Sequence, residues 1–305
     1  MRVLVTGGAG FIGSHIVELL LEHGHDVAVI DNLSTGKEEN VPKGARLYPV
    51  DLTSWRIQEV LATEKPEVII HQAAQIDVRR SVENPAMDAR VNIIGSINLL
   101  EHAREFGVQK VVYASSAAVY GNPLSVPVAE DHPILATSPY GVSKYVVERY
   151  LYVYRELYGI DFTVLRYANV YGPRQDPLGE GGVVAIFTHR LAKGLPVTIF
   201  GDGEQTRDYV YVGDVARANL LALTQGGGEV VNISCAREVS VNQLLQIMQD
   251  VTGVQATVHW APKRPGEIDR SALANDRARR VLGWRPSVTL AEGIERVFAY
   301  ERASL

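Results

Sequence analysis

Short apolar runs alternate with amphipathic stretches along the first half of the chain. The runs are rich in Val, Leu and Ile, which is typical of strands buried on both faces, and they cover residues 2–6, 26–30, 46–50, 67–71 and 110–114. Helical patterns lie between or after these runs, one ending near residue 24, one extending from about 84 to 106, and one beginning at Ser138. Because strands joined by helical crossovers lie parallel, the sequence predicts an open, doubly wound α/β sheet.

The strict alternation of strands and helices loosens after residue 166. A loop rich in Gly and Pro at residues 173–182 is of the kind that closes over a ligand. Helical patterns farther on predict a smaller lobe over the sheet, at residues 183–193, 240–252 and 289–301. Strand-like runs near 208–212 and 229–233 return to the large domain. We therefore expect a first domain of residues 1–166, with 208–235 added to it, and a second lobe of residues 167–207 and 236–305.

Composition narrows the class of protein. The chain has 305 residues, of which 46% are hydrophobic and 21% charged, and its formal net charge of −5 argues against a nucleic-acid partner held by a basic surface. Cys235 is the single cysteine, so an intramolecular disulfide and a cysteine-rich metal site are both excluded. The first residues lead directly into a strand, and no apolar run reaches the roughly 18 residues of a membrane span. We expect a cytoplasmic enzyme with no metal, no nucleic acid and no membrane partner.

The first strand leads into a glycine-rich turn, TGGAGFIG, which is followed by a helix. Gly7 and Gly10 allow a tight turn whose backbone amides can approach a pyrophosphate, and Gly13 lets the helix pack closely on the sheet. Asp31 ends the next strand, where a carboxylate can accept hydrogen bonds from an adenosine ribose. It would also repel a 2′-phosphate, and no arginine follows it within ten residues. The sequence therefore favours NAD over NADP, although Lys37 lies in that stretch.

Two later strands end in residues that suit a ligand crevice. Asp51 and Leu52 could meet adenine, although an aspartate at this position also commonly caps the following helix. Ala73, Ala74 and Gln75 have side chains that would let a ligand approach the backbone, or that would simply pack tightly in the core. Both interpretations stay open at each strand end.

Three further polar residues are candidates for the same crevice. Asn92 lies in the long helical stretch, where its amide could hold the neighbouring helix or could only face solvent. Ser115 and Ser116 follow the fifth strand, at the edge where parallel sheets bind ligands. Either hydroxyl could cap the turn, and one of them beside a general base could relay a proton.

The stretch from Ser138 to Lys144 reads as the start of a helix with chemistry on one face. Ser138 is a good N-cap and Pro139 suits the first turn, so Tyr140 and Lys144 fall one turn apart on the same side. A phenol has an ordinary pKa of about 10, and a neighbouring ammonium together with a bound cationic ring would lower it. Tyr140 is therefore a candidate general base, although a tyrosine and a lysine at this spacing are also common as a surface pair.

With these motifs the chain resembles the extended short-chain dehydrogenase/reductase family, and more narrowly the UDP-galactose 4-epimerases. The matching segments extend over nearly the whole chain: residues 6–13, 31–36 (DNLSTG), 115–121 (SSAAVYG), 140–144 (YGVSK), 166–174 (RYANVYGPR), 207–212 (RDYVYV) and 264–267 (RPGE). The resemblance implies a Rossmann-like α/β fold with a smaller C-terminal lobe for the substrate. It also implies NAD as the cofactor and a UDP-sugar as the substrate.

The resemblance assigns roles to individual residues. It implies that Tyr140 is the catalytic base, that Lys144 lowers its pKa and contacts the nicotinamide ribose, and that Ser116 is the hydroxyl beside the phenol. The cofactor-binding residues would be Gly7, Gly10, Phe11, Ile12, Gly13, Asp31, Asn32, Ser34, Thr35, Gly36, Asp51, Leu52, Ala73, Ala74, Gln75, Asn92, Ser115, Tyr140, Lys144 and Tyr167. The substrate-binding residues would be Ser116, Tyr140, Asn169, Val183, Arg207, Arg264, Glu267 and Ser271, with the two arginines on the diphosphate.

The implied activity is UDP-glucose/UDP-galactose 4-epimerisation, in which C4 of the sugar is oxidised to a ketone and then reduced on its other face. A small residue at Ser271 would leave room for an N-acetylated sugar, so interconversion of UDP-GlcNAc and UDP-GalNAc is one alternative. A UDP-glucuronate epimerase is another, if Arg79, Arg80 or Arg174 meets the carboxylate.

Other functions on the same fold are less favoured by the residues. A sugar-nucleotide dehydratase or decarboxylase usually carries an acid after the active-site hydroxyl, but here Ala117 and Ala118 follow it. A non-catalytic protein that only senses dinucleotides tends to lose one of the three catalytic residues, and Ser116, Tyr140 and Lys144 are all present.

The resemblance also implies a homodimer, in which the helices near 84–106 and 139–158 pair into a four-helix bundle. Within the second of these helices, apolar residues offer some support for such an interface: Val146, Val147, Tyr150, Leu151 and Tyr154.

Overall fold

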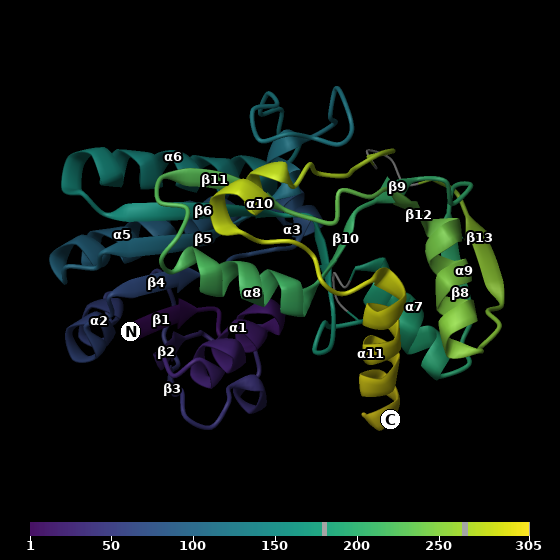
Figure 1. Ribbon diagram of the computed structural model, residues 1–305, viewed down its shortest axis with the longest axis horizontal. Helices are drawn as coiled ribbons and strands as arrows, with labels where there is room; N and C mark the ends of the chain where they lie inside the picture. Colours follow the sequence, from purple (N-terminus) through teal and green to yellow (C-terminus); the bar gives the residue numbers. More distant parts are fainter. Residues whose placement is uncertain (179–181, 264–267, 305) are drawn as a thin grey trace.

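The computed structural model describes residues 1–178, 182–263 and 268–304 of the chain. A large α/β part begins at the N-terminus, and a smaller lobe at its side carries the C-terminus (Figure 1). In the described part of the chain, none of the helices combines the length and the apolar character that crossing a membrane requires.

The large part is built on a seven-stranded sheet in which all neighbouring strands are parallel. Its strands, in spatial order, are β11 (Glu229–Ile233), β6 (Asp161–Tyr167), β5 (Lys110–Ser116), β4 (Val68–His71), β1 (Arg2–Thr6), β2 (Asp26–Ile30) and β3 (Arg46–Tyr48). The order of the strands reverses direction between β1 and β4, as it does in doubly wound sheets. The predicted Rossmann-like α/β fold is therefore confirmed.

The strands of this sheet send alternate side chains to opposite faces. Val3 and Val5 of β1 pack in one hydrophobic core, and Leu4 between them packs in the other. Val68 and Ile69 of β4 divide between the two cores in the same way. Continuous apolar runs are therefore what a sheet covered on both faces requires, because both kinds of position are buried.

Helices cover each face of the sheet. One face carries α2 (Ile57–Glu64), α5 (Gly95–Glu105) and α6 (Pro139–Tyr158). The other carries α1 (Phe11–Glu22), α8 (Val212–Ala222) and α10 (Asp276–Leu282). The sheet is thus the middle layer of three, and its carboxyl edge remains available for a site.

The smaller lobe, on the right of Figure 1, combines short strand pairs with helices. Its parallel pairs are β7 (Asn169–Tyr171) with β10 (Tyr209–Tyr211), and β8 (Val197–Phe200) with β13 (Val258–Ala261). Its antiparallel pair is β9 (Thr206–Arg207) with β12 (Val239–Ser240). These strands share a hydrophobic core with α7 (Val183–Ala192), α9 (Val241–Thr252) and α11 (Leu290–Ala303).

The helical segment predicted for about residues 84–106 is confirmed, because α4 (Pro85–Ala89), the π-helical turn η2 (Arg90–Ile94) and α5 follow one another directly. The shorter α3 (Val78–Glu83) precedes it. Asn84 ends α3 and caps α4, because its side chain accepts the backbone N–H of Met87 at 3.0 Å. Asn92 lies inside the π turn, a feature that often occurs at functional sites.

The division of the chain into a first domain and a second lobe stays a prediction. β11 lies in the large sheet beside β6, and α8 packs on the sheet together with α1. However, α10 and Trp284 belong to the stretch that we assigned to the second lobe, and both pack in a hydrophobic core of the sheet instead.

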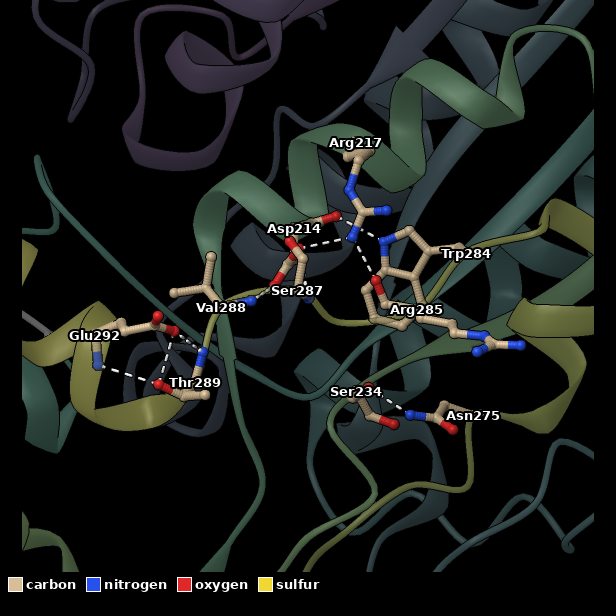
Figure 2. Close-up of polar contacts among 10 residues, drawn as sticks. All are labelled: Asp214, Arg217, Ser234, Asn275, Trp284, Arg285, Ser287, Val288, Thr289 and Glu292. Atoms are coloured by element: carbon tan, nitrogen blue, oxygen red, sulfur yellow. Dashed lines mark hydrogen bonds and ion pairs between the residues drawn. The ribbon is translucent and has the colours of Figure 1, made fainter.

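Asp214 on α8 attaches the C-terminal segment to the large part (Figure 2). Its buried carboxylate accepts the backbone N–H groups of Ser287 at 2.9 Å and Val288 at 3.0 Å, and Nη2 of Arg217 at 2.8 Å. The carbonyl oxygen of Asp214 accepts the indole N–H of Trp284 at 2.8 Å. One residue therefore fixes the segment that leads from α10 into α11.

Candidate active site

The glycine-rich turn joins β1 to α1 at the reversal of strand order. Gly7 has a left-handed φ of 72°, and a Cβ on it would lie 2.7 Å from the backbone nitrogen of Ala73. A Cβ on Gly13 would lie 2.1 Å from the carbonyl oxygen of Gly7. Side chains at these positions would push the turn away from the helix and from the end of β4. Phe11 and Ile12 begin α1 just after the turn and pack against the core of the smaller lobe.

Asp31 lies at the end of β2, directly beside this turn. Its buried carboxylate accepts the backbone N–H of Ala9 at 3.0 Å and of Leu33 at 2.9 Å. A Cβ on Gly36 would come within 2.9 Å of both carboxylate oxygens, so the loop closes tightly around the acid. A glycine cradle with an adjacent carboxylate is the donor and acceptor set that NAD requires, and these residues fit the cofactor.

Asp51, one of the residues that could meet adenine, is held by hydrogen bonds from neighbouring residues. Asn32 Nδ2 donates to Oδ2 of Asp51 at 2.7 Å, and the other carboxylate oxygen accepts the backbone N–H of Thr53 at 2.8 Å. Asp51 therefore organises the turn after β3, as a capping residue does, and Leu52 beside it is buried. Ser34 and Thr35 lie exposed in the loop after β2.

The end of β4 is held by Asn92. Its Oδ1 accepts the backbone N–H of Gln75 at 2.7 Å, and its Nδ2 donates to the Gln75 carbonyl and to Oγ of Ser143, both at 3.0 Å. Asn92 thus links the strand end to α6, in agreement with the expectation that its amide could hold the neighbouring helix. Ala73 and Ala74 are half-buried at this strand end.

α6 begins as the sequence predicts, and it carries the catalytic candidates. Ser138 accepts the backbone N–H of Gly141 at 3.1 Å, with Pro139 in the first turn. Tyr140 is half-buried and hydrogen-bonded to Ser116 at the end of β5. Lys144 is buried, its Nζ donates to the carbonyl oxygen of Ala114 at 2.8 Å, and the same atom lies 6.0 Å from the centre of the Tyr140 ring. The structure therefore brings all three candidates together.

The expected lowering of the Tyr140 pKa by Lys144 stays a prediction. Burial raises the pKa of the Tyr140 phenol above its usual value, the Ser116 hydrogen bond lowers it, and the Asp88 carboxylate raises it. Burial also lowers the pKa of Lys144 to about 8, against the charges of Asp88 and Glu148, which raise it. The Ser116 hydrogen bond thus favours the phenolate, while Lys144 donates to the backbone of β5.

Two of the predicted cofactor residues have side chains that are already bound within the protein. Ser115 is buried and donates to Oε1 of Glu148 at 2.6 Å. The Tyr167 hydroxyl accepts hydrogen bonds from Gln72 at 3.0 Å and from Asn219 at 2.8 Å, while burial raises its pKa to about 12. Contact of either residue with a cofactor stays a prediction.

The remaining predicted substrate residues come from several elements. Asn169 begins β7, Val183 begins α7, and Ser271 is half-buried beside the buried Ala272. Arg207 in β9 donates through Nη1 to the carbonyl oxygens of Thr206 at 2.7 Å and Ile268 at 2.8 Å. Arg264 and Glu267 lie outside the described residues.

The arginines considered for a glucuronate are dispersed. Arg174 donates to Glu18 on α1 through Nη1 at 2.9 Å, and its guanidinium also contacts His15. Arg79 and Arg80 lie on α3, on a different element. Among the described residues, no three His, Cys, Asp or Glu side chains come together in a way that could hold a metal ion.

Sequence reasoning missed the buried polar residues that support this site. Glu148 lies four residues after Lys144, so helical spacing alone places it one turn farther along the same face. The available signal for Glu148 was an acidic residue on the face of the helix that is expected to be buried. Gln72 and Asn219 had no comparable signal, because their partners come from different elements.

Comparisons with known proteins agree with this geometry. Residues 3–234 match the NAD dependent epimerase/dehydratase family. A UDP-glucose 4-epimerase of Mycolicibacterium smegmatis is 46% identical over 309 residues, covering 99% of this chain and 99% of that protein. The crystal structure of a UDP-glucose 4-epimerase from Thermotoga maritima with UDP-glucose has a TM-score of 0.98 and 47% identity, and covers 100% of this chain and 99% of that one.

A second solved structure shows the cofactor. The UDP-glucose 4-epimerase of Thermus thermophilus in complex with NAD has a TM-score of 0.95 and 47% identity, with 100% of each chain covered. The glycine turn, the acid beside it and the Ser-Tyr-Lys group thus occur in a chain that matches such proteins from end to end. The chain belongs to the NAD dependent epimerase/dehydratase family.

Proposed function

We propose that this protein is an NAD-dependent UDP-glucose 4-epimerase. The observation that carries the proposal is the hydrogen bond between Ser116 and Tyr140, made beside a glycine cradle at the reversal of strand order. A phenol in this position lies where a sugar hydroxyl would meet the cofactor. The full-length similarity to UDP-glucose 4-epimerases supports the choice of sugar nucleotide.

The chain's own residues supply the proton chemistry. Tyr140 accepts the proton of the sugar 4-hydroxyl, directly or through the Ser116 hydroxyl, as the C4–H bond breaks, and it returns the proton when C4 is reduced on its other face. When bound, NAD supplies the acceptor that takes the C4 hydride and gives it back, together with a positive ring near the phenol. Lys144 anchors the same region through the β5 backbone.

The substrate must stay held by its nucleotide while the sugar turns between the two half-reactions. We assign Arg207 to the diphosphate, and the two carbonyl oxygens that accept its Nη1 support this role because they orient the guanidinium. Asn169 and Val183 begin elements of the smaller lobe, so they would meet the sugar from the side opposite α6.

The other functions on this fold are less well supported. Ala117 and Ala118 lie in a short helical turn capped by Ser116, whose Oγ accepts the backbone N–H of Ala118 at 3.2 Å. Because both residues are alanines, neither can protonate a leaving hydroxyl. Arg174 is held by Glu18, which makes it a poor receptor for the carboxylate of a glucuronate.

Tyr140→Phe tests the proposed function. We expect the purified protein to convert UDP-galactose into UDP-glucose without added reductant, and the variant to lose at least about a hundredfold in kcat while it retains NAD. Tyr152→Phe, an exposed tyrosine on the same helix, is the matched control and should leave kcat unchanged. A Tyr140→Phe variant with normal turnover would show that another group is the base.

We also propose that the protein forms a homodimer through α6. The apolar positions that the sequence offers for this interface divide in the structure: Val147, Leu151 and Tyr154 are buried in the protein's own core, so they cannot form an interface. Tyr150 is exposed, and an apolar surface is formed by it with Val142, Val153 and Leu157 of α6 and Ile94 of η2. Sedimentation of the protein as a monomer at micromolar concentration would contradict this proposal.

The compartment that we propose is the cytoplasm. Cys235 is a free, half-buried thiol, and burial raises its pKa to about 12. A reducing compartment is compatible with a single cysteine kept in this state.

A further inference from the structure

A buried ion pair lies next to the catalytic residues, and the proposed reaction assigns it no role. Glu148 is 5% exposed and lies on α6 one turn after Lys144. Arg166 in β6 is 4% exposed, and Ser115 in β5 is 3% exposed. Burying an ion pair is costly, so its presence next to the active site suggests a use other than stability alone.

The contacts of Glu148 reach two strands. Its Oε1 accepts Oγ of Ser115 at 2.6 Å and Nε of Arg166 at 2.9 Å, and its Oε2 accepts Nη2 of Arg166 at 2.6 Å. The remaining Nη1 of Arg166 donates to the Tyr120 hydroxyl at 2.8 Å and to the Glu130 carbonyl at 3.3 Å. The guanidinium is therefore fixed from both sides, and it holds the carboxylate in a bidentate pair.

Consecutive residues of β5 are bound to successive turns of α6. The Ala114 carbonyl accepts Lys144 Nζ, the Ser115 hydroxyl donates to Glu148, and Ser116 is hydrogen-bonded to Tyr140. Attachment at three turns of a helix fixes its rotation and its axial position on the strand, because sliding or turning would break more than one bond. Of the three attachments, only that of Glu148 is further secured by a buried counter-ion.

We propose that Glu148 is a positioning residue for the reaction, which holds α6 on β5 and β6 through Ser115 and Arg166 so that Tyr140 and Lys144 face Ser116. This inference rests on the proposed epimerase function. It assigns Glu148 no contact with substrate or cofactor.

The charge of Glu148 gives the proposal a measurable signature. Burial lowers the pKa of Lys144 to about 8, while the carboxylates of Asp88 and Glu148 raise it. The charged or titratable groups around Lys144 come from α4, α6, β5 and β4, and they are Asp88, Glu148, Tyr140, Tyr113 and His71. If one of the two carboxylates is removed, less negative charge opposes the effect of burial on the pKa of Lys144. Lys144 would then lose its proton at a lower pH.

The experiment compares Glu148→Gln with wild type in the conversion of UDP-galactose, with kcat measured as a function of pH. We expect the alkaline limb of kcat to move to lower pH by about one unit, and kcat at neutral pH to fall about tenfold with little change in KM. Glu156→Gln on the exposed side of the same helix is the matched control, and its profile should coincide with that of wild type. Wild type without any epimerase activity would instead refute the proposed function itself.

Two further variants separate positioning from stability. Glu148→Gln combined with Arg166→Met removes both buried charges, which avoids leaving an unpaired cation, and its alkaline limb should still lie below that of wild type. Ser115→Ala removes one hydrogen bond and keeps both charges, so it should lower kcat without moving the alkaline limb. If Glu148→Gln and the double variant keep the wild-type limb, or if Ser115→Ala keeps the wild-type kcat, Glu148 does not position the site.

Discussion

Gly7 and Gly13 approach each other across the first turn so closely that a methyl group has no place. The Cβ of an alanine at position 13 would lie 2.1 Å from the Gly7 carbonyl oxygen, well inside any contact distance. The atom in the way belongs to the backbone, which has no rotamer to change. At this scale the dinucleotide site depends on the absence of a Cβ atom at residue 13.

Gly13→Ala should therefore lose most of its NAD. We expect the cofactor released from a denatured sample to fall at least about tenfold per chain, because the turn must open and move its amides away from the pyrophosphate. Gly253→Ala is the control, since Gly253 also has a left-handed φ of 70° at a helix end but nothing within 4 Å of its Cβ. It should cost about 1 kcal/mol of stability and leave the NAD content unchanged. Equal NAD contents in the two variants would contradict the steric argument.

The residues that were predictable from sequence are those whose chemistry is local. The glycine turn, and Tyr140 with Lys144, each lie within one short segment, so spacing alone relates their members. The partners of Ser115 could not be predicted, because Glu148 and Arg166 come from other elements and meet it only in the fold. The partners of the Tyr167 hydroxyl could not be predicted either, because Gln72 and Asn219 also come from other elements.

At the scale of elements, the connection between α10 and α11 depends on α8. Asp214 gathers the backbone N–H groups of Ser287 and Val288 on one buried carboxylate, and Trp284 reaches its carbonyl oxygen (Figure 2). Loss of the carboxylate would leave buried donors without an acceptor, which is more costly than the loss of an exposed bond.

Asp214→Ala should lower the free energy of unfolding by about 3 kcal/mol or more, measured by urea denaturation. The control is Asp250→Ala, at an exposed position of α9 whose carboxylate accepts only a neighbouring Gln246 bond on the helix surface. That variant should change the unfolding free energy by less than about 0.5 kcal/mol. Similar losses in both variants would mean that Asp214 is not the anchor.

Helix ends were predicted better than helix interiors. The start of α6 follows from Ser138 and Pro139, which are local signals. The π-helical turn η2 inside the 84–106 segment was not predictable, because Asn92 in it bonds to Gln75 and Ser143, which lie on other elements. Tertiary contacts decided where that helix departs from regular geometry.

At the scale of the whole molecule, the doubly wound parallel sheet was within reach of the sequence, because the strands of the first half are short runs separated by helical patterns. The sequence pattern of the smaller lobe indicated less, since its strands are two to four residues long and form separate two-stranded pairs. Trp284 falls within residues 236–305, which we assigned to the second lobe, and it packs in a hydrophobic core of the large sheet.

The stability of the molecule should fall in mild acid because of His71. Its ring is buried between Thr6 and Ser96, and burial, followed by the charge of Lys144, lowers its pKa to about 3. An unfolded histidine titrates near 6.5, so this contribution is fully present above pH 6.5 and is lost as pH falls toward 3. The lowered pKa of His71 contributes as much as about 5 kcal/mol to the free energy of unfolding.

His71→Gln keeps a polar side chain at this position and removes the titration. We expect its unfolding free energy to depend less steeply on pH between 6.5 and 4 than that of wild type. Asp208 acts in the opposite sense in both proteins, because burial raises its pKa to about 6, so the comparison cancels its effect. Parallel curves for the two proteins would show that another group causes the acid sensitivity.

The attachment of Trp284 and α10 to the large sheet has a consequence for how the protein is made. β1 leaves the ribosome well before α10 and Trp284, which complete one covering layer of the sheet. A nascent chain that ends within α9 would expose the apolar surfaces of α8 and β11 that Trp284 and Leu282 later cover. Exposed surfaces of this kind attract chaperones and favour aggregation. We therefore expect stable folding of the sheet to await the synthesis of residues 276–284, and not to accompany that of its first strands.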